Sequence, residues 1–360
     1  MACSSGQSFR LVRVPSGQHV NSTPLASQRK LPSYSRTTVS QQNHAAPQRQ
    51  RASRIVREKS LRCEGSTGGY SQGVHVPKSI HDVDNGKILG FGADLAKEHP
   101  GFLDEAYKRR RMDIVSLAKS HTFGEPIPRV EYSSSEVTAW GTALRELKAL
   151  YPTHACKEFL RNWDLFEFRE DVVPQLQDVH DIIHAQTGWN IRPVAGLMHP
   201  RDFLNGLAFE TFHSTQYVRH ESQPMYTPEP DVIHELLGHV VMLTDPNYCH
   251  LVKCIGEASL GATEKEIWHL TKVYWYTVEF GVVKEGDSIK AFGAGILSSY
   301  GELEHMIDGS PILEPFDPSM AQPKMSYKDG FQKRYFVMDS FEQGCRLLEE
   351  FSAGLVRARK

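Results

Sequence analysis

The most informative stretch of this sequence is His-Glu-Leu-Leu-Gly-His at residues 234–239, followed about forty residues later by Glu279 in Tyr-Trp-Tyr-Thr-Val-Glu-Phe-Gly (274–281). Two imidazoles and one carboxylate form a facial triad, which holds one side of an octahedral metal ion and leaves the other side open. The pattern around Glu279 is typical of a helix. We therefore predict a mononuclear metal site with His234, His239 and Glu279 as ligands.

The spacing of the two histidines differs from that of a zinc peptidase, in which they stand four residues apart on one helix face. Here position 238 is Gly, and the second histidine follows one residue later. Five residues of an ideal α-helix turn by about 500°, so the imidazoles would point roughly 140° apart. We predict that the helix ends or deforms between them and that Gly238 tolerates this change.

Charge is distributed unevenly along the chain. Residues 1–57 contain no Asp or Glu but nine Lys or Arg, although the net charge of the whole chain is −2. A basic, Ser-rich leader of this kind is typical of an organelle transit peptide. We predict a disordered transit peptide for plastids over residues 1–64 and a catalytic domain over residues 65–360, with a disordered basic tail as the alternative for the leader.

The composition of the rest of the chain argues against several kinds of partner. The acidic body is unsuited to nucleic acid or an anionic membrane, and no stretch approaches the ~20 apolar residues of a membrane span. The six cysteines show no CxxC spacing, which indicates reduced thiols that pack in the fold.

The pattern of apolar residues predicts a mainly helical fold around a central cavity, with few and short strands. Helices are expected over residues 171–188, after the capping-box sequence Thr-Glu-Lys-Glu (263–266), and from residue 341 toward the C-terminus. One short strand is expected at residues 191–194.

Longer motifs extend the pattern around the triad: Thr-Pro-Glu-Pro-Asp-Val-Ile-His-Glu-Leu-Leu-Gly-His (227–239), Gly-Asp-Ser-Ile-Lys-Ala-Phe-Gly-Ala-Gly-Ile-Leu-Ser-Ser (286–299), Arg-Pro-Val-Ala-Gly (192–196) and Gln-Tyr-Val-Arg-His (216–220). Together with residues 274–281 they strongly resemble the pterin-dependent aromatic amino acid hydroxylases, from about residue 80 to 350. The resemblance implies a helical basket around one Fe(II), held by His234, His239 and Glu279.

The resemblance also implies roles for residues around the metal. Glu235 would act near the pterin ring without binding the metal, and Arg219 would hold the substrate carboxylate, because a buried arginine without a carboxylate would be costly. Thr227 and Ser298 match the hydroxyls that position the amino acid head group. The walls around the aromatic ring match Trp275, His213 and Pro230.

The pterin loop matches the family only in part. Gly196, Leu197 and Phe203 are in place, and Phe203 is suited to stacking on a planar ring. Met198, His199 and Pro200 occupy a segment in which animal members have small hydroxyl residues at the last two positions. This departure leaves the donor open between a tetrahydropterin and a tetrahydrofolate.

The resemblance implies a monooxygenase that converts L-phenylalanine to L-tyrosine with O2, Fe(II) and a reduced pterin or folate. Hydroxylation of tryptophan or tyrosine, a zinc hydrolase with the same triad, and a non-enzymatic metal- or amino-acid-binding sensor remain alternatives. Pro224-Met-Tyr-Thr227 resembles the phenylalanine branch. We expect no N-terminal regulatory domain, no C-terminal tetramerisation helix, and a monomer or weak oligomer.

Overall fold

The computed structural model describes residues 76–90, 95, 97, 99–227, 229–307, 311–319 and 330–359. The chain divides into two units, Met1–Ser66 and Thr67–Lys360, and all described residues lie in the second unit. The predicted transit peptide, residues 1–64, lies outside the described residues, as do Cys3 and Cys63.

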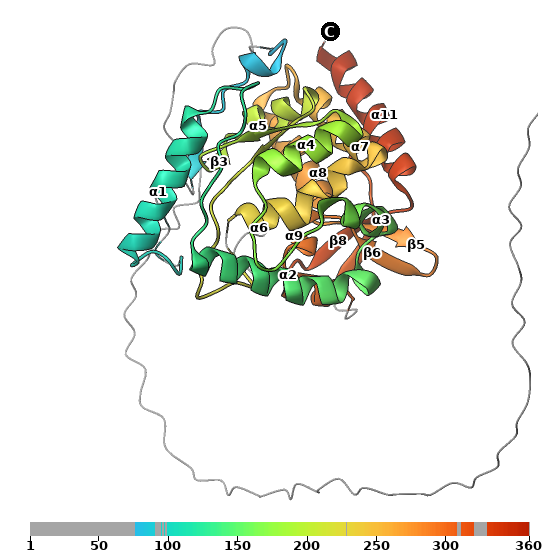
Figure 1. Cartoon of the computed structure of the whole chain (residues 1–360). Coiled ribbons are helices and arrows are strands. Elements are labelled where there is room, and N and C mark those ends of the chain that lie inside the picture. The colour runs from blue at the N-terminus through green and yellow to red at the C-terminus, as the bar shows by residue number, and fades with distance from the viewer. Residues whose placement is uncertain are drawn as a thin grey trace, which may run out of the picture. The chain divides into compact units, whose positions relative to one another are not determined.

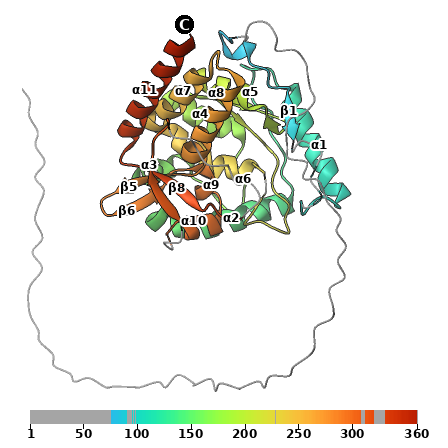
Figure 2. The ribbon, with the colours of Figure 1, turned by 180° about the vertical axis from the view of Figure 1, so that it is seen from behind.

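The second unit is mainly helical, as predicted (Figures 1 and 2). Helix α11 packs along α7, and α1 lies at the opposite edge of the unit in both views. The α-helices are α1 (Glu105–Ser120), α2 (Ser134–His154), α3 (Lys157–Trp163), α4 (Leu176–Thr187), α5 (Pro200–Ala208), α6 (Val232–His234), α7 (Pro246–Ser259), α8 (Glu264–Tyr274), α9 (Ala294–Leu297), α10 (Tyr300–Ile307) and α11 (Phe341–Arg359). Short 3-10 helices are η1 (Ile80–Asp82), η2 (Asp164–Phe166) and η4 (Met242–Thr244), and two π-helices are η3 (Glu235–Val240) and η5 (Trp275–Glu279).

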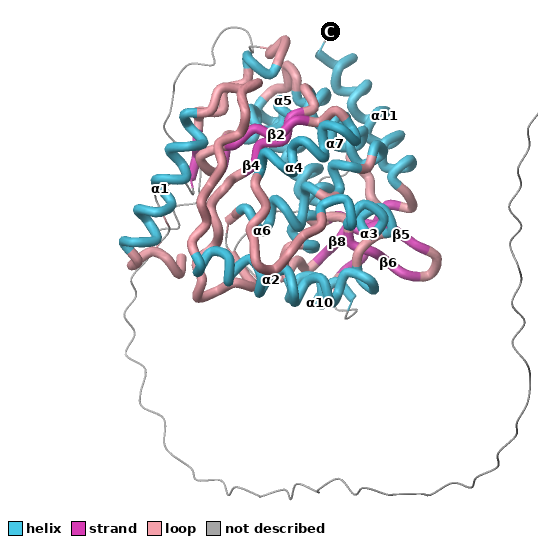
Figure 3. The backbone as a smooth tube through the Cα atoms, viewed as in Figure 1, coloured by secondary structure: helices cyan, strands magenta, loops and turns pink. Residues whose placement is uncertain are grey.

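The strands are short and form three small sheets among the described residues (Figure 3). Strands β1 (Ile88–Gly90) and β3 (Leu197–Met198) pair antiparallel, whereas β2 (Asn190–Pro193) and β4 (Thr211–Ser214) pair in parallel. The third sheet has the order β6-β5-β8-β7, from β5 (Gly281–Glu285), β6 (Ser288–Ala291), β7 (Ile312–Pro315) and β8 (Arg334–Met338). The predicted strand at 191–194 therefore exists as β2, shifted by one residue.

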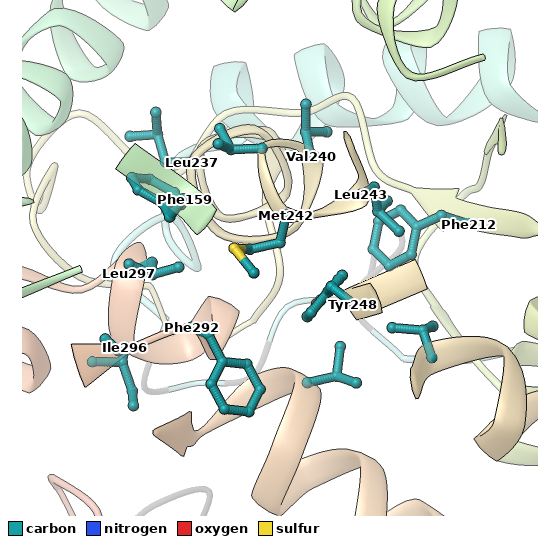
Figure 4. Close-up of a cluster of buried hydrophobic side chains, with 14 of the residues drawn as sticks. Phe159, Phe212, Leu237, Val240, Met242, Leu243, Tyr248, Phe292, Ile296 and Leu297 are labelled. Carbon is teal, nitrogen blue, oxygen red and sulfur yellow. The ribbon is translucent and has the colours of Figure 1, made fainter. Parts of the chain in front are cut away.

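A continuous apolar core fills the space between these elements. Met242 lies near Tyr248 and between side chains from distant parts of the chain, among them Phe159 and Phe292 (Figure 4). All four are fully buried. The core therefore fixes the η3–η4 segment, which carries His239 and directly follows His234, against α3, α7 and the segment before α9.

A predicted helix boundary is correct where residues next to it in the sequence cap the helix. It is wrong where a contact with a distant segment sets the boundary. Thr263 and Glu266 form the predicted capping box at the start of α8. Helix α4 ends at Gly188 as predicted but begins at residue 176 instead of 171. Gln175 is held extended because its side-chain amide accepts from the Val130 N–H at 2.8 Å and donates to the Val130 carbonyl at 3.0 Å. Among the described helices, none combines the length and apolarity needed to span a bilayer.

Candidate metal centre and active site

The helix that carries both histidines changes its hydrogen-bonding pattern between them. Asp231 caps α6 by accepting from the His234 N–H at 3.0 Å, and the α-helix becomes π-helical from Glu235 to Val240. In a π-helix the hydrogen bonds join residues five apart, so residues i and i+5 lie on successive turns of one face. The predicted deformation is therefore present, and it places His234 and His239 side by side.

Gly238 serves this segment in a different way from the one predicted. Its backbone does not adopt the left-handed conformation that favours glycine. Instead, a Cβ at this position would lie 2.7 Å from Ala294 Cβ and 2.8 Å from the Ala294 carbonyl oxygen. Gly238 is thus required for the close approach of α9 to the π-helix.

A second π-helix, η5, delivers the carboxylate. Phe280 N–H donates to the carbonyl of Trp275, five residues earlier, at 2.9 Å. Glu279 ends this π-helix, and one residue, Phe280, separates it from β5, which begins at Gly281. Both segments that carry the triad therefore depart from α-helical geometry, a feature that is frequent at functional sites.

The three donor groups converge on one point. The Nε2 atoms of His234 and His239 are 3.1 Å apart, and the Glu279 carboxylate lies 3.5 Å from the first and 3.2 Å from the second. Donors about 2.1 Å from a shared ion at right angles would be about 3.0 Å apart. The donor set therefore fits one divalent metal ion with its opposite side open.

A hydroxyl group fixes the tautomer of His234. Ser298 Oγ donates to the carbonyl of Ala294 at 2.7 Å and lies 2.8 Å from His234 Nδ1. The carbonyl can only accept, so the single proton of the Ser298 hydroxyl goes to it. The hydrogen bond between His234 Nδ1 and Ser298 Oγ must therefore use a proton on Nδ1. Nε2 of His234 is then unprotonated and directed at the other two donors. Sequence reasoning placed Ser298 at the substrate head group and missed this contact.

The charges of the triad suit a cation. Burial lowers the pKa of His234 to about 4, which keeps the imidazole neutral at pH 7. Burial acts to raise the pKa of Glu279, but the imidazoles of His239 and His234 outweigh it and lower this pKa to about 2. A buried carboxylate and the neutral imidazole of His234 therefore face the same point.

A recess with about 330 Å³ of empty space, part of it open to solvent, lies beside the triad. Its walls include most of the residues predicted for the pterin, and two of those predicted for the substrate ring. The predicted residues that line it are Gly196, Leu197, Met198, Phe203, His213, Pro230 and Glu235, and Val194, Thr215 and Tyr217 complete the lining.

Glu235 connects the recess with the triad, since it follows His234 directly and lines the recess. Its carboxylate accepts from the Thr215 N–H at 3.1 Å and the Thr215 hydroxyl at 3.2 Å. Burial raises the pKa of Glu235 to about 7, although the His239 imidazole and the bonds from Thr215 oppose the shift. A carboxyl group with such a pKa can hold or release a proton near neutral pH. Thr215 was missed from the sequence, in which no motif distinguishes it.

Arg219 has a carboxylate partner within the protein. Its Nε and NH2 groups donate to Asp231 at 3.0 and 2.7 Å, and NH1 donates to the Pro224 carbonyl at 3.2 Å. Both side chains of the ion pair are buried. The argument that burial requires a substrate carboxylate for Arg219 is therefore wrong, because Asp231 supplies one. Asp231 lies within the 227–239 motif, and nothing in the sequence marks it as the partner of Arg219.

The remaining predicted residues lie outside the lining of this recess. His199 is the N-cap of α5, and its Nδ1 accepts from the Arg201 N–H at 3.3 Å, while Pro200 occupies the first helical position, where a missing N–H costs little. Trp275 packs on Phe280, with ring centroids 4.7 Å apart. The Thr227 hydroxyl is buried without a hydrogen-bond partner among the described residues.

His213 lines the recess and, like the Tyr217 hydroxyl, is a buried group there without a hydrogen-bond partner among the described residues. Neither ring nitrogen has a hydrogen bond within the described part of the chain. Burial lowers the pKa of His213 to about 3, and the nearby Arg192 adds to the shift. A neutral imidazole in the wall of the recess, with both nitrogens unsatisfied, is suited to contact with a ligand that fills the space.

Comparison with known proteins identifies the family. A family model described as biopterin-dependent aromatic amino acid hydroxylase matches residues 74–360. The chloroplastic phenylalanine 4-monooxygenase of Chlamydomonas reinhardtii is 60% identical over 302 residues, 84% of this chain and 83% of that protein. The tryptophan 5-hydroxylase of Xenopus laevis is 46% identical over 287 residues, 78% of this chain and 60% of that protein.

Solved structures agree with this result. The structure of Chromobacterium violaceum phenylalanine hydroxylase with bound iron(III) and oxidised 7,8-dihydrobiopterin superposes with a TM-score of 0.62 at 33% identity, covering 70% of this chain and 92% of that one. The fold, the convergent triad and the extent of these matches lead to one conclusion. The chain belongs to the biopterin-dependent aromatic amino acid hydroxylases.

Proposed function

We propose that this protein is a phenylalanine 4-monooxygenase, which converts L-phenylalanine to L-tyrosine with O2, iron and a reduced pterin. The observation that carries the proposal is the convergence of His234, His239 and Glu279 beside a recess that Glu235 shares. Bound iron and the pterin would supply the two-electron reduction of O2 that inserts one oxygen atom into the aromatic ring.

The chain's own residues hold, orient and shield the reactants. The triad would hold the metal from one side and leave the other side open, and the Ser298 hydroxyl keeps the His234 tautomer that could bind it. The Thr215–Glu235 pair places a carboxyl group with a pKa of about 7 at the pterin ring, where it holds or releases a proton. The buried residues of the walls would limit the access of water to the reacting ring.

The substrate is proposed to lie against the residues that the resemblance assigns to it. The edge of Arg219 opposite Asp231 would hold the substrate carboxylate, and the buried Thr227 hydroxyl would bind the head group with Ser298. His213, Pro230 and Trp275 would surround the aromatic ring. Relatives that act on phenylalanine and on tryptophan both match this chain, and the higher identity to the phenylalanine enzyme favours phenylalanine.

The proposed pterin site consists of Gly196, Leu197, Met198, Phe203 and Glu235, with His199 just beyond the lining. Phe203 would stack on the ring, and its own ring is held edge-on by Tyr274 at a centroid distance of 5.2 Å. Leu197 is 44% exposed and lies where the recess meets solvent. The longer substituent of a folate could extend from the recess into solvent past Leu197, so we include a tetrahydrofolate among the proposed donors.

The setting of the enzyme forms part of the same proposal. Residues 1–64 would direct the protein to plastids, and residues 65–360 would form the catalytic domain. Relatives named as chloroplastic support this location. A monomer or weak oligomer is proposed for the assembled state.

Turnover with defined donors tests the proposal. Protein without residues 1–64 is reconstituted anaerobically with Fe(II), mixed with O2 and phenylalanine, and supplied in parallel with tetrahydrobiopterin or tetrahydrofolate. Tyrosine should form, and the Glu279→Gln variant should form none. Equimolar tryptophan in the same mixture measures substrate preference. Absence of tyrosine with every donor, or preferential hydroxylation of tryptophan, would contradict the assignment.

A further inference from the structure

A second group of metal-binding side chains lies at the contact between α7 and α11. It consists of His250 and Cys254 on α7 and Glu349 on α11, and one ligand atom from each lies within 4.8 Å of the others. Helix α11 lies at the edge of the unit and packs along α7 (Figures 1 and 2). None of these residues belongs to the triad or lines the recess.

Three different donor atoms meet around the His250 imidazole. Nε2 of His250 lies 2.7 Å from the Glu349 carboxylate and 3.8 Å from Cys254 Sγ. The positions i and i+4 place His250 and Cys254 on one face of α7, and Glu349 reaches across from the neighbouring helix. An ordinary surface ion pair between His250 and Glu349 would have no need of the thiol beside the same nitrogen.

The cluster has one buried residue, Cys254, and two exposed rim residues, His250 and Glu349. Cys254 is only 4% exposed, whereas the side chains of His250 and Glu349 are about half exposed at 50% and 53%. An ion can therefore enter from solvent, and the two rim side chains can rotate to meet it. The cation beside the thiol, Lys253, is paired with Glu210 at 2.7 Å.

We propose that His250, Cys254 and Glu349 form a zinc site that fastens α11 to α7. Thiolate, imidazole and carboxylate are all zinc ligands, at about 2.3 Å for sulfur and 2.0–2.2 Å for nitrogen and oxygen. Sulfur and nitrogen on one tetrahedral ion would then lie about 3.6 Å apart, close to the 3.8 Å between Cys254 Sγ and His250 Nε2. The thiol releases its proton to solvent on binding, and water fills the fourth position.

Cobalt(II) is the probe that separates this site from the triad, because a thiolate bound to cobalt gives an ultraviolet charge-transfer band and the triad contains no sulfur. The full-length protein, first saturated with Fe(II) under anaerobic conditions, is titrated with Co²⁺ and then with Zn²⁺. We expect a band that saturates at one equivalent and disappears when zinc replaces cobalt. Absence of the band would overturn the proposal whether or not the protein hydroxylates phenylalanine.

Single substitutions identify the ligands. C254S should abolish the band, and H250Q or E349Q should weaken cobalt binding at least about tenfold. C249S is the matched control, since Cys249 is another buried thiol of α7 but donates to the Leu243 carbonyl and stands outside the cluster. A band that survives C254S, or that is lost in C249S or C345S alone, would refute the assignment.

A stability measurement tests the consequence for α11. Zinc should raise the midpoint of thermal unfolding of the iron-loaded wild type, because an ion bound only to the folded state stabilises it. E349Q alters an exposed carboxylate and should fold normally, but zinc should raise its midpoint by clearly less than that of the wild type. An equal zinc effect in wild type and E349Q would show that the metal acts elsewhere.

Discussion

Replacing Gly238 by alanine tests how the π-helix is held. The added Cβ would lie 2.7 Å from Ala294 Cβ and 2.9 Å from Ala294 Cα. Carbon atoms in contact prefer a separation of about 3.5–4.0 Å, so α9 must move away from the π-helix by roughly 1 Å. Because Ser298 follows α9 directly, its 2.8 Å bond to His234 Nδ1 would lengthen beyond hydrogen-bonding distance.

Two magnitudes follow from this displacement. Overpacking a buried contact typically costs about 1–3 kcal/mol of unfolding free energy, and this cost should be visible in the metal-free protein. Loss of a partner that orients a metal ligand weakens metal binding about 10–100-fold. We therefore expect Gly238→Ala to lower both stability and iron affinity, with helical content maintained.

The assay combines urea unfolding of the metal-free protein with an iron titration. A double variant combines Gly238→Ala with Ala294→Gly. The second substitution removes the Cβ–Cβ contact but leaves the clash with the backbone of residue 294, so it should restore part of the lost stability and iron affinity. Gly354→Ala is the control, because a Cβ there meets no atom within 4 Å. Unchanged stability and iron affinity in Gly238→Ala, or a defect that Ala294→Gly does not relieve at all, would refute the steric account.

Further predictions concern the ligands and their supports. Glu279→Ala should abolish stoichiometric iron binding and hydroxylation while circular dichroism shows normal helical content; an active variant with full iron would contradict the triad. Ser298→Ala should raise the iron dissociation constant about 10–100-fold, measured by titration, and an unchanged constant would show that the His234 tautomer is set otherwise. Arg219→Ala should cost about 3–5 kcal/mol of stability in urea because it leaves Asp231 buried and unpaired. Adding Asp231→Asn should recover much of that stability without restoring the KM for phenylalanine, and recovery of both would show that Arg219 serves only the fold.

The sequence was most informative where chemistry depends on spacing. The interval of five residues between His234 and His239 is incompatible with one face of an α-helix, and this alone predicted a deformation between them. The ligand set and the family followed from motifs that are contiguous in the chain. The mainly helical fold, the capping box at Thr263 and the family assignment are confirmed.

Other features depend on contacts between distant segments, and no local pattern contains them. Thr215 holds Glu235 from twenty residues away, and Asp231 both caps α6 and pairs with Arg219. The start of α4 is set by the pairing of Gln175 with Val130, 45 residues earlier. Such partners are ordinary residue types, so only the folded chain distinguishes them from their neighbours.

The short helix α9 explains how two π-helices can hold their ligands together. It packs against both η3 and η5, which bring His239 and Glu279 to the metal. Gly238 permits its close approach on one side, and Tyr151 of α2 donates a hydrogen bond to its Leu297 carbonyl at 2.8 Å. Ser298 at its end orients His234. A π-helix is rare because its hydrogen-bonding pattern is less favourable than that of an α-helix, so two adjacent ones require support from outside. One four-residue helix, fixed by the core, therefore gives that support to all three ligands.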